Sequence, residues 1–100
     1  MTTATATASH RQQVIERLRA RPKLAAAYVQ AAIDAGDQGA LLLALRTVAE
    51  ARGGMSMIAE KTGLKRESVS RALSATGNPR LSSLNAILSA AGLQITVKQA

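Results

Sequence analysis

Cysteine, phenylalanine and tryptophan are absent from this 100-residue chain, and Tyr28 is its one aromatic residue. Without cysteine there is no disulfide, no thiolate nucleophile and no cysteine-based metal site. The lone histidine, His10, lacks the companions that a zinc site needs, so we expect a solvated side chain and no bound metal. Hydrophobic residues still make up 47% of the chain, and most are alanine or leucine, which are strong helix formers. The composition therefore predicts an all-α fold with a thin core.

Long hydrophobic runs are also missing. The apolar run LLLAL at 41–45 is far shorter than the roughly 20 residues that cross a bilayer. The first nine residues, MTTATATAS, lack the basic start and apolar block of a secretory signal, and they predict a disordered tail over 1–9. The lack of cysteine is compatible with a reducing cytosol, so we expect a cytoplasmic protein with no membrane partner.

Clusters of reactive side chains are equally scarce. The serines at positions 68, 70, 82 and 83 have no base beside them that could activate a hydroxyl. The glycine-containing segment ARGGMS matches neither of the phosphate-binding fingerprints. The sequence therefore predicts neither a catalytic residue nor a cofactor, and an enzyme is the class we least expect.

Negative charge is in short supply, with 6 acidic residues against 13 lysines and arginines and a net charge of +7. Residues 1–50 hold six basic and four acidic residues, a net charge of +2, whereas residues 51–100 hold seven and two, a net charge of +5. A local basic excess favours a polyanion partner, because binding releases counterions from phosphates. On charge alone, a basic surface that only keeps the protein soluble is an equal alternative.

The first half of the chain reads as three helices, expected over residues 10–21, 23–35 and 38–52. Gly36 ends the second of these helices, and Asp37 is placed to cap the third. Leu24 and Tyr28 recur at helical spacing, so we expect them on the buried face of the second helix.

Three shorter helices are expected in the second half, over residues 57–62, 66–73 and 81–91. Ser56 is a suitable N-cap for the first of them. The tail QITVK at 94–98 alternates Ile95 and Val97 with polar residues, which predicts a short strand. A lone strand needs a partner to pair with, and a second copy of the chain is the candidate.

Two of these short helices are joined by a turn with the spacing of a helix-turn-helix. Ala59 is a small residue where the helices cross, Gly63 tolerates the positive φ of the turn, and Val69 fixes the second helix to the first. Leu64 adds an apolar residue inside the turn. Chance could provide any one of these residues, but all four within a basic segment favour DNA binding.

The stretch MSMIAEKTGLKRESVSRALSATGNPRLSSLNAILSAAGL resembles the Xre/Cro-type helix-turn-helix of phage repressors. More narrowly, TGLKRESVSRAL followed by GNPRLSSLNAILSAAGLQITV is similar to the addiction-module antidote proteins. These are small bacterial antitoxins, usually encoded beside a RelE/ParE-like toxin. The close resemblance covers about residues 38–97.

The resemblance implies a lambda-repressor-like helix-turn-helix bundle of about five to six helices. The alternating residues 94–98 add a possible short strand at its C-terminal end. Its organisation would be a helical extension over 10–37 and a DNA-binding domain over 38–100. The implied function is a sequence-specific transcriptional repressor that is the antitoxin of a type II toxin-antitoxin module and represses its own operon. The implied partners are double-stranded operator DNA and a RelE/ParE-like toxin, for which the arginine-rich N-terminal helix is the candidate contact.

Burial of Val69 and Leu73 turns the opposite face of the second helix of the pair outward. The expected DNA-contacting residues on and around this helix are Lys65, Arg66, Glu67, Ser68, Ser70 and Arg71. Arg66 and Arg71 can each bind a guanine through two hydrogen bonds, and Glu67 can accept one from a cytosine amino group. The alternative is a solvated face on which Glu67 pairs with Arg71 at i, i+4.

Positions outside this helix complete the predicted DNA contacts. Asn78 and Arg80 flank Pro79 in the following loop, where the resemblance implies backbone phosphate contacts. Ser56 begins the first helix of the pair, whose N-terminus can point at a phosphate. Lys65 stands where many Xre-type turns carry serine or threonine, and lysine cannot N-cap, so it is expected to reach a phosphate instead.

A homodimer is expected, because one recognition helix reads only a few base pairs and dimers match two half-sites. Two other functions remain open from the sequence. One is a solitary Xre-family regulator that has no toxin. The other is a protein-interaction module whose basic face does not bind DNA.

Overall fold

The structure, a computed structural model, describes the backbone of residues 3–100 and the side chains from His10 onward. Within this part of the chain six helices follow one another, and no strand is present. They are α1 (Thr3–Ala20), α2 (Pro22–Asp34), α3 (Gln38–Ala51), α4 (Gly54–Thr62), α5 (Arg66–Ala72) and α6 (Leu81–Ala90). The all-α prediction is confirmed.

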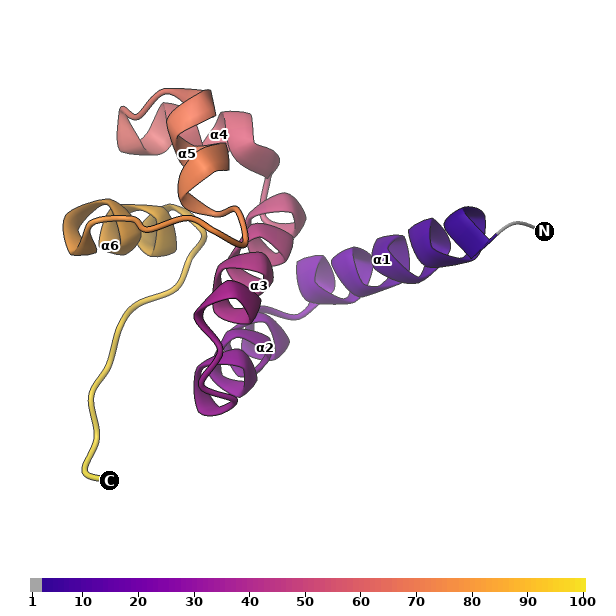
Figure 1. The fold of residues 1–100 in the computed structure, drawn as a ribbon, viewed down its shortest axis with the longest axis horizontal. Coiled ribbons are helices and arrows are strands. Elements are labelled where there is room, and N and C mark those ends of the chain that lie inside the picture. The colour runs from indigo at the N-terminus through magenta and orange to yellow at the C-terminus, as the bar shows by residue number, and fades with distance from the viewer. Residues whose placement is uncertain (1–2) are drawn as a thin grey trace.

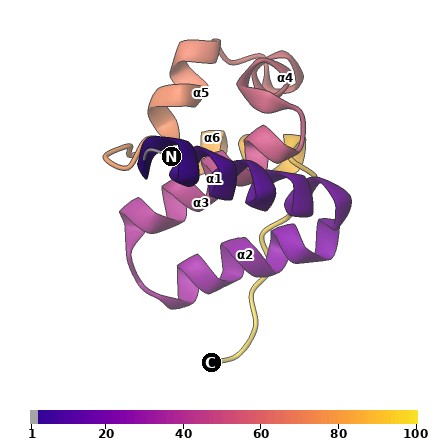
Figure 2. The ribbon, with the colours of Figure 1, turned by 90° about the vertical axis from the view of Figure 1, so that its right-hand side faces the viewer.

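Helix α3 is the central element of the bundle (Figure 1). It packs against α1, α2 and α4, and α4 packs in turn against α5 and α6. In the view of Figure 2, α1 lies across α3 while α2 runs below them. The pair of α4 and α5 therefore lies on one side of α3, and α2 lies on the other.

A single hydrophobic core joins these elements. Its largest fully buried side chains come from helices at both ends of the chain, and they are Leu18, Val48, Ile58, Val69, Leu73 and Ile87. Each such side chain contributes roughly 1.5–3 kcal/mol relative to an exposed position. Ala25 and Val29 of α2 belong to the same cluster, so the core includes α1 and α2 together with the helices that follow them.

The end of α2 and the start of α3 form as the sequence predicts, while α2 begins at Pro22, one residue before the expected start. Pro22 occupies the start of α2, where its missing N–H costs no hydrogen bond. Gly36, with φ +74°, follows the end of this helix. The Asp37 side chain then accepts a hydrogen bond from the Ala40 N–H at 3.2 Å and caps α3.

The buried face of α2 differs from the expectation. Ala25 and Val29 are buried, whereas Leu24 and Tyr28 are 37% and 39% exposed. An alanine-rich helix offers two neighbouring apolar stripes. The stripe with smaller side chains faces inward here, and small side chains let two helix axes approach closely.

The start of α4 also differs. Helix α4 begins at Gly54 with Gly53 at its N-cap, so Ser56 lies in the first turn and is not the cap. Gly53 and Gly54 have φ values of +132° and +90°. This pair allows the chain to leave α3 and begin α4 at once, three residues before the expected start.

Both ends of the chain depart from the expected secondary structure. Helix α1 begins at Thr3 and includes most of the stretch expected as a tail, of which residues 1 and 2 lie outside the described residues. The expected strand at 94–98 does not form within the chain. The Leu93 N–H donates to the Leu88 oxygen at 2.8 Å, and beyond it the described backbone makes no hydrogen bond. Residues 3–100 contain no other strand with which it could pair.

Candidate nucleic-acid interface

The turn between α4 and α5 sets the orientation of the candidate site. Gly63 ends α4 with φ +76°, and its N–H donates to the Ala59 oxygen at 2.9 Å. The Thr62 hydroxyl donates to the Ile58 oxygen at 2.8 Å and accepts from the Leu64 N–H at 3.2 Å. The predicted role of Gly63 is confirmed, and Thr62 adds hydrogen bonds that hold the turn.

Helix α5 buries one face and exposes the other. Val69 and the capping residue Leu73 are completely buried, as predicted, and Ala59 on α4 is buried as well. The exposed side chains on and beside α5 are Lys65, Arg66, Glu67, Ser68 and Arg71. Five of the six residues predicted around this helix therefore lie together on its accessible side.

The basic side chains on this face have no acidic partner within ion-pair distance. Among the side chains from His10 onward, the two ion pairs both involve Glu50 on α3. The i, i+4 pair between Glu67 and Arg71 is therefore not formed. Lys65 occupies the N-cap position of α5 without a capping hydrogen bond from its side chain. Arg66 and Arg71 are thus left available to a ligand that carries acceptors.

Ser70, the sixth predicted residue on α5, is half-buried and bound to α3. Arg46 donates from Nη1 to the Ser70 carbonyl oxygen at 3.1 Å and from Nη2 to the Ser70 hydroxyl oxygen at 3.2 Å. The Ser70 hydroxyl therefore lies where α5 meets α3, at the edge of the exposed face.

Sequence reasoning missed Arg46, which belongs to a chain of polar contacts from α1 to α5. Arg46 Nε lies 3.7 Å from Glu50 Oε1, and Glu50 Oε2 lies 2.8 Å from Arg11 Nη2 on α1. Arg11 Nη1 also donates to the Thr47 hydroxyl at 3.2 Å. A cation within the apolar run LLLALRTVA was the available signal, because a charged side chain in such a helix needs a partner.

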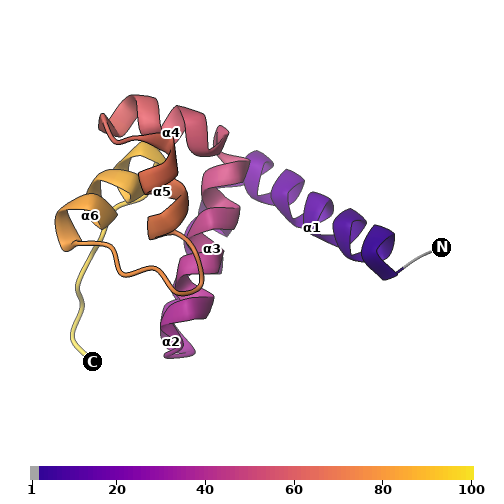
Figure 3. The same ribbon diagram turned by 45° about the horizontal axis from the view of Figure 1, so that its top comes forward.

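The loop between α5 and α6 is held against the end of α5. A Cβ atom at Gly77 would come within 2.7 Å of the Arg71 oxygen and closer still to the Ala72 oxygen, so only glycine fits there. The Gly77 N–H donates to the Ser74 oxygen at 2.9 Å. Figure 3 shows this loop passing beside α3, where the Gln38 amide donates to the Gly77 oxygen at 3.5 Å.

The loop carries two further predicted contacts on its surface. Asn78 and Arg80 are both exposed, and Arg80 is the N-cap residue of α6 without a capping side-chain hydrogen bond. Ser56 is exposed in the first turn of α4. These positions belong to the first turn of α4 and to the loop that follows α5, the segments on either side of α5 in the sequence.

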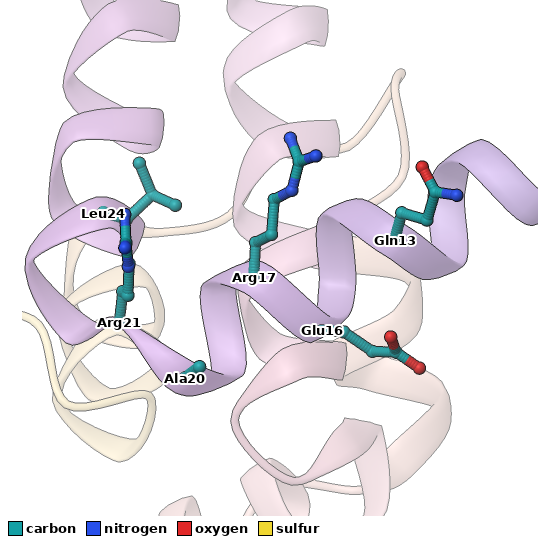
Figure 4. A pocket seen from close by; sticks show the side chains of 6 residues that line it. All are labelled: Gln13, Glu16, Arg17, Ala20, Arg21 and Leu24. Atoms are coloured by element: carbon teal, nitrogen blue, oxygen red, sulfur yellow. The ribbon is translucent and has the colours of Figure 1, made fainter.

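The hollow at the corner between α1 and α2 does not resemble a ligand site. It has a volume of about 440 Å³ and is lined by Gln13, Glu16, Arg17, Ala20, Arg21 and Leu24. Its polar side chains diverge, with Arg17 and Glu16 pointing in different directions (Figure 4).

Among the described residues no group of three or more histidines or carboxylates is placed to hold a metal ion. None of the described helices is both long enough and apolar enough to cross a membrane.

Comparison with known proteins yields a family and one curated relative. Residues 9–99 match the family described as "Probable addiction module antidote protein". An uncharacterized protein of Haemophilus influenzae is 42% identical to this chain over 59 residues, which are 59% of the chain and 60% of that relative. The match therefore spans less than two thirds of the relative's length. No solved structure matches the chain. Because the family match covers nearly the whole sequence, the chain belongs to the "Probable addiction module antidote protein" family.

Proposed function

We propose that this protein is the antitoxin of a type II toxin-antitoxin module and that it represses its own operon by placing α5 in the major groove of operator DNA. The observation that supports this proposal most directly is that α5 has one buried apolar face and one exposed basic face. Val69 and Leu73 fix the helix from within, while Arg66 and Arg71 are exposed on its outer face and have no acidic partner among the described side chains.

Base recognition is proposed for the N-terminal part of α5. In a helix-turn-helix the first residues of the second helix meet base edges, which is the position of Arg66 and Glu67. Arginine binds guanine through two hydrogen bonds, and a glutamate accepts from cytosine. Ser68 is small enough to permit close approach, and Arg71 follows one turn after Glu67.

Phosphate contacts are proposed on both sides of this helix. Lys65 precedes α5, and Asn78 and Arg80 lie in the loop held against its other end. Ser56 in the first turn of α4 is a further candidate. Such contacts fix the register of a protein on the duplex without reading its sequence. Because one helix reads few base pairs, we propose a homodimer on two half-sites.

The antitoxin assignment is supported by the family's description and by the resemblance of residues 38–97 to antidote proteins. The proposed partner is a small RelE/ParE-like toxin encoded beside this chain. Expression of that toxin alone should arrest growth, and co-expression of this chain should restore it. A chain that binds DNA but never restores growth would be a solitary regulator.

DNA binding is tested by fluorescence anisotropy with the DNA upstream of the gene and a shuffled duplex of equal length. We expect a preference of at least ~10³-fold for the upstream DNA at physiological salt, as specific regulators show. For both duplexes the logarithm of the binding constant should fall linearly with the logarithm of the salt concentration. Equal affinities for the two duplexes would refute the repressor and favour a module that binds only proteins.

A further inference from the structure

The C-terminal tail is the one segment of the described chain that is extended and carries exposed β-branched apolar side chains. After Leu93 its backbone makes no hydrogen bond to the rest of the molecule. Ile95 is 48% exposed and Val97 is 93% exposed. In Figure 1 the tail leaves α6 and ends well away from the helices. Its backbone donors and acceptors, like those of an edge strand, are open to a second strand.

We propose that residues 94–98 pair with the same residues of a second copy of this chain, as an antiparallel two-stranded ribbon centred on Thr96. The sequence QITVK is self-complementary in this register. Thr96 lies opposite Thr96 of the second copy, and Ile95 lies opposite its Val97. Cross-strand pairs of β-branched residues on one face stabilise a sheet.

The same register also separates like charges. Lys98 lies opposite Gln94 of the second copy, so the two lysines are at opposite ends of the ribbon. Antiparallel pairing needs only a twofold axis, which is the symmetry of most homodimers. A parallel pairing would place the two lysines side by side, and like charges directly opposite one another are destabilising.

A surface on which the ribbon can pack lies beside the start of the tail. An isolated pair of strands is only marginally stable in water, so the ribbon needs an apolar support. Val29, Ile33, Leu88 and Leu93 line a groove of about 200 Å³, and residues 94–96 of the tail line the same groove. Ile33 is 49% exposed there. Ile95 and Val97 project from one face of an extended strand, and that face can cover the groove.

This inference concerns assembly alone and is tested without DNA. The chain has no cysteine, so Thr96→Cys introduces its single thiol. Under mild oxidation we expect a disulfide-linked dimer, because the two Thr96 positions face each other across the ribbon. Lys98→Cys is the matched control on the same exposed tail. The two Lys98 positions lie roughly 14 Å apart in this register, beyond the ~7 Å between Cα atoms that a disulfide spans.

Cross-linking of both variants at the same rate would show random collision and overturn the ribbon. Light scattering on the full chain provides the second measurement. We expect a dimer whose Kd rises at least ~10-fold in the double variant Ile95→Lys, Val97→Lys, with the helical circular dichroism unchanged. A monomeric parent chain, or a double variant that dimerises as tightly as the parent, would also overturn the proposal.

Discussion

The guanidinium of Arg46 lies between Glu50 on its own helix and Ser70 on α5. The last four carbonyl groups of any helix lack partners within the helix, and α5 has only seven residues. Arg46 donates to one of these carbonyls and brings a positive charge to the negative end of the helix dipole. One side chain of α3 therefore stabilises the C-terminal end of the helix that we propose enters the DNA groove.

Replacing Arg46 with methionine should lower the free energy of unfolding by about 1–3 kcal/mol, because the Ser70 carbonyl loses its donor. Methionine keeps most of the apolar stem, so packing changes little. Urea denaturation measures the effect. The matched control is Arg52→Met, since Arg52 makes no side-chain hydrogen bond or ion pair among the described contacts. Equal losses in both variants would contradict this role of Arg46.

Arg66 and Lys65 are neighbours with different expected roles in DNA binding. Arg66→Ala should cost about 1–3 kcal/mol on the preferred sequence and relax the choice of base there. Lys65→Ala should weaken binding to all sequences alike and reduce the salt slope by about 1 for each bound protomer. Anisotropy titrations on the upstream and shuffled duplexes distinguish base reading by Arg66 from phosphate contact by Lys65. An Arg66→Ala protein with full discrimination would make Arg66 a phosphate contact.

Residues whose role depends on local backbone rules could be predicted from the sequence. Asp37 and Gly63 act within four residues of their own positions, so helix-end preferences identify them. The bond from Arg46 to Ser70 joins positions 24 apart, and no local rule predicts it. The exposed face of α5 followed from Val69 and Leu73, but the inward turn of Ser70 did not.

The corner formed by α4 and α5 depends on a glycine in the left-handed region. Gly63 has φ +76°, and an added Cβ would meet nothing within 4 Å, so a substitution there strains the backbone without a clash. Gly36 after α2 has nearly the same geometry, with φ +74° and open space. The two glycines therefore form a matched pair, one in the connection between α2 and α3 and one in the turn between α4 and α5.

Gly63→Ala and Gly36→Ala should each destabilise the protein by about 1–2 kcal/mol, the cost of placing an alanine in the left-handed region. Only Gly63→Ala should also lower the affinity for upstream DNA, because it alone acts on the angle between α4 and α5. Thermal denaturation of both variants measures the loss of stability, and fluorescence anisotropy measures their affinity for upstream DNA. A loss of DNA affinity in Gly36→Ala of the same size would show that stability alone governs binding.

Helix existence was predictable for every helix of the described chain, whereas some boundaries and faces were not. The ends of α3 agree with the expectation because Asp37 and the glycine pair mark them. The face of α2 required knowledge of how closely it approaches α3, which depends on residues elsewhere in the chain. Apolar and polar residues alternate in the tail as they do in a strand. A strand forms only when a second segment pairs with it, so the sequence of one segment does not predict the pairing.

On the scale of the whole molecule, one core connects the region expected as an extension with the region expected as the DNA-binding domain. Ile15 and Leu18 of α1 share a cluster with Val48, Ile58 and Ile87 from later helices. Because the core contains no large aromatic side chain, each leucine in it accounts for a substantial part of the buried apolar surface. Removing one from α1 should therefore weaken the entire bundle.

Leu18→Ala should lower the free energy of unfolding by about 2–5 kcal/mol, because Leu18 is completely enclosed. Leu24→Ala, at a half-exposed position on the next helix, is the control and should cost less than half as much. Urea denaturation followed by circular dichroism measures both, and unfolding in one transition is expected for a single core. A Leu18→Ala protein that loses only the helical signal of α1 would show that α1 folds separately.

The position of Tyr28 on α2 gives the molecule an optical signal that reports on one side of the bundle. In a chain without tryptophan, the near-ultraviolet absorption and the intrinsic fluorescence both come from this phenol. It is partly exposed on α2, across α3 from α4 and α5 (Figure 1). A protein that covers α2 should change the emission of Tyr28, whereas a duplex held by α5 should change it only through the absorption of light by the bases, for which the signal is corrected. Ultraviolet fluorescence of the unlabelled chain can thus distinguish two kinds of complex in one cuvette.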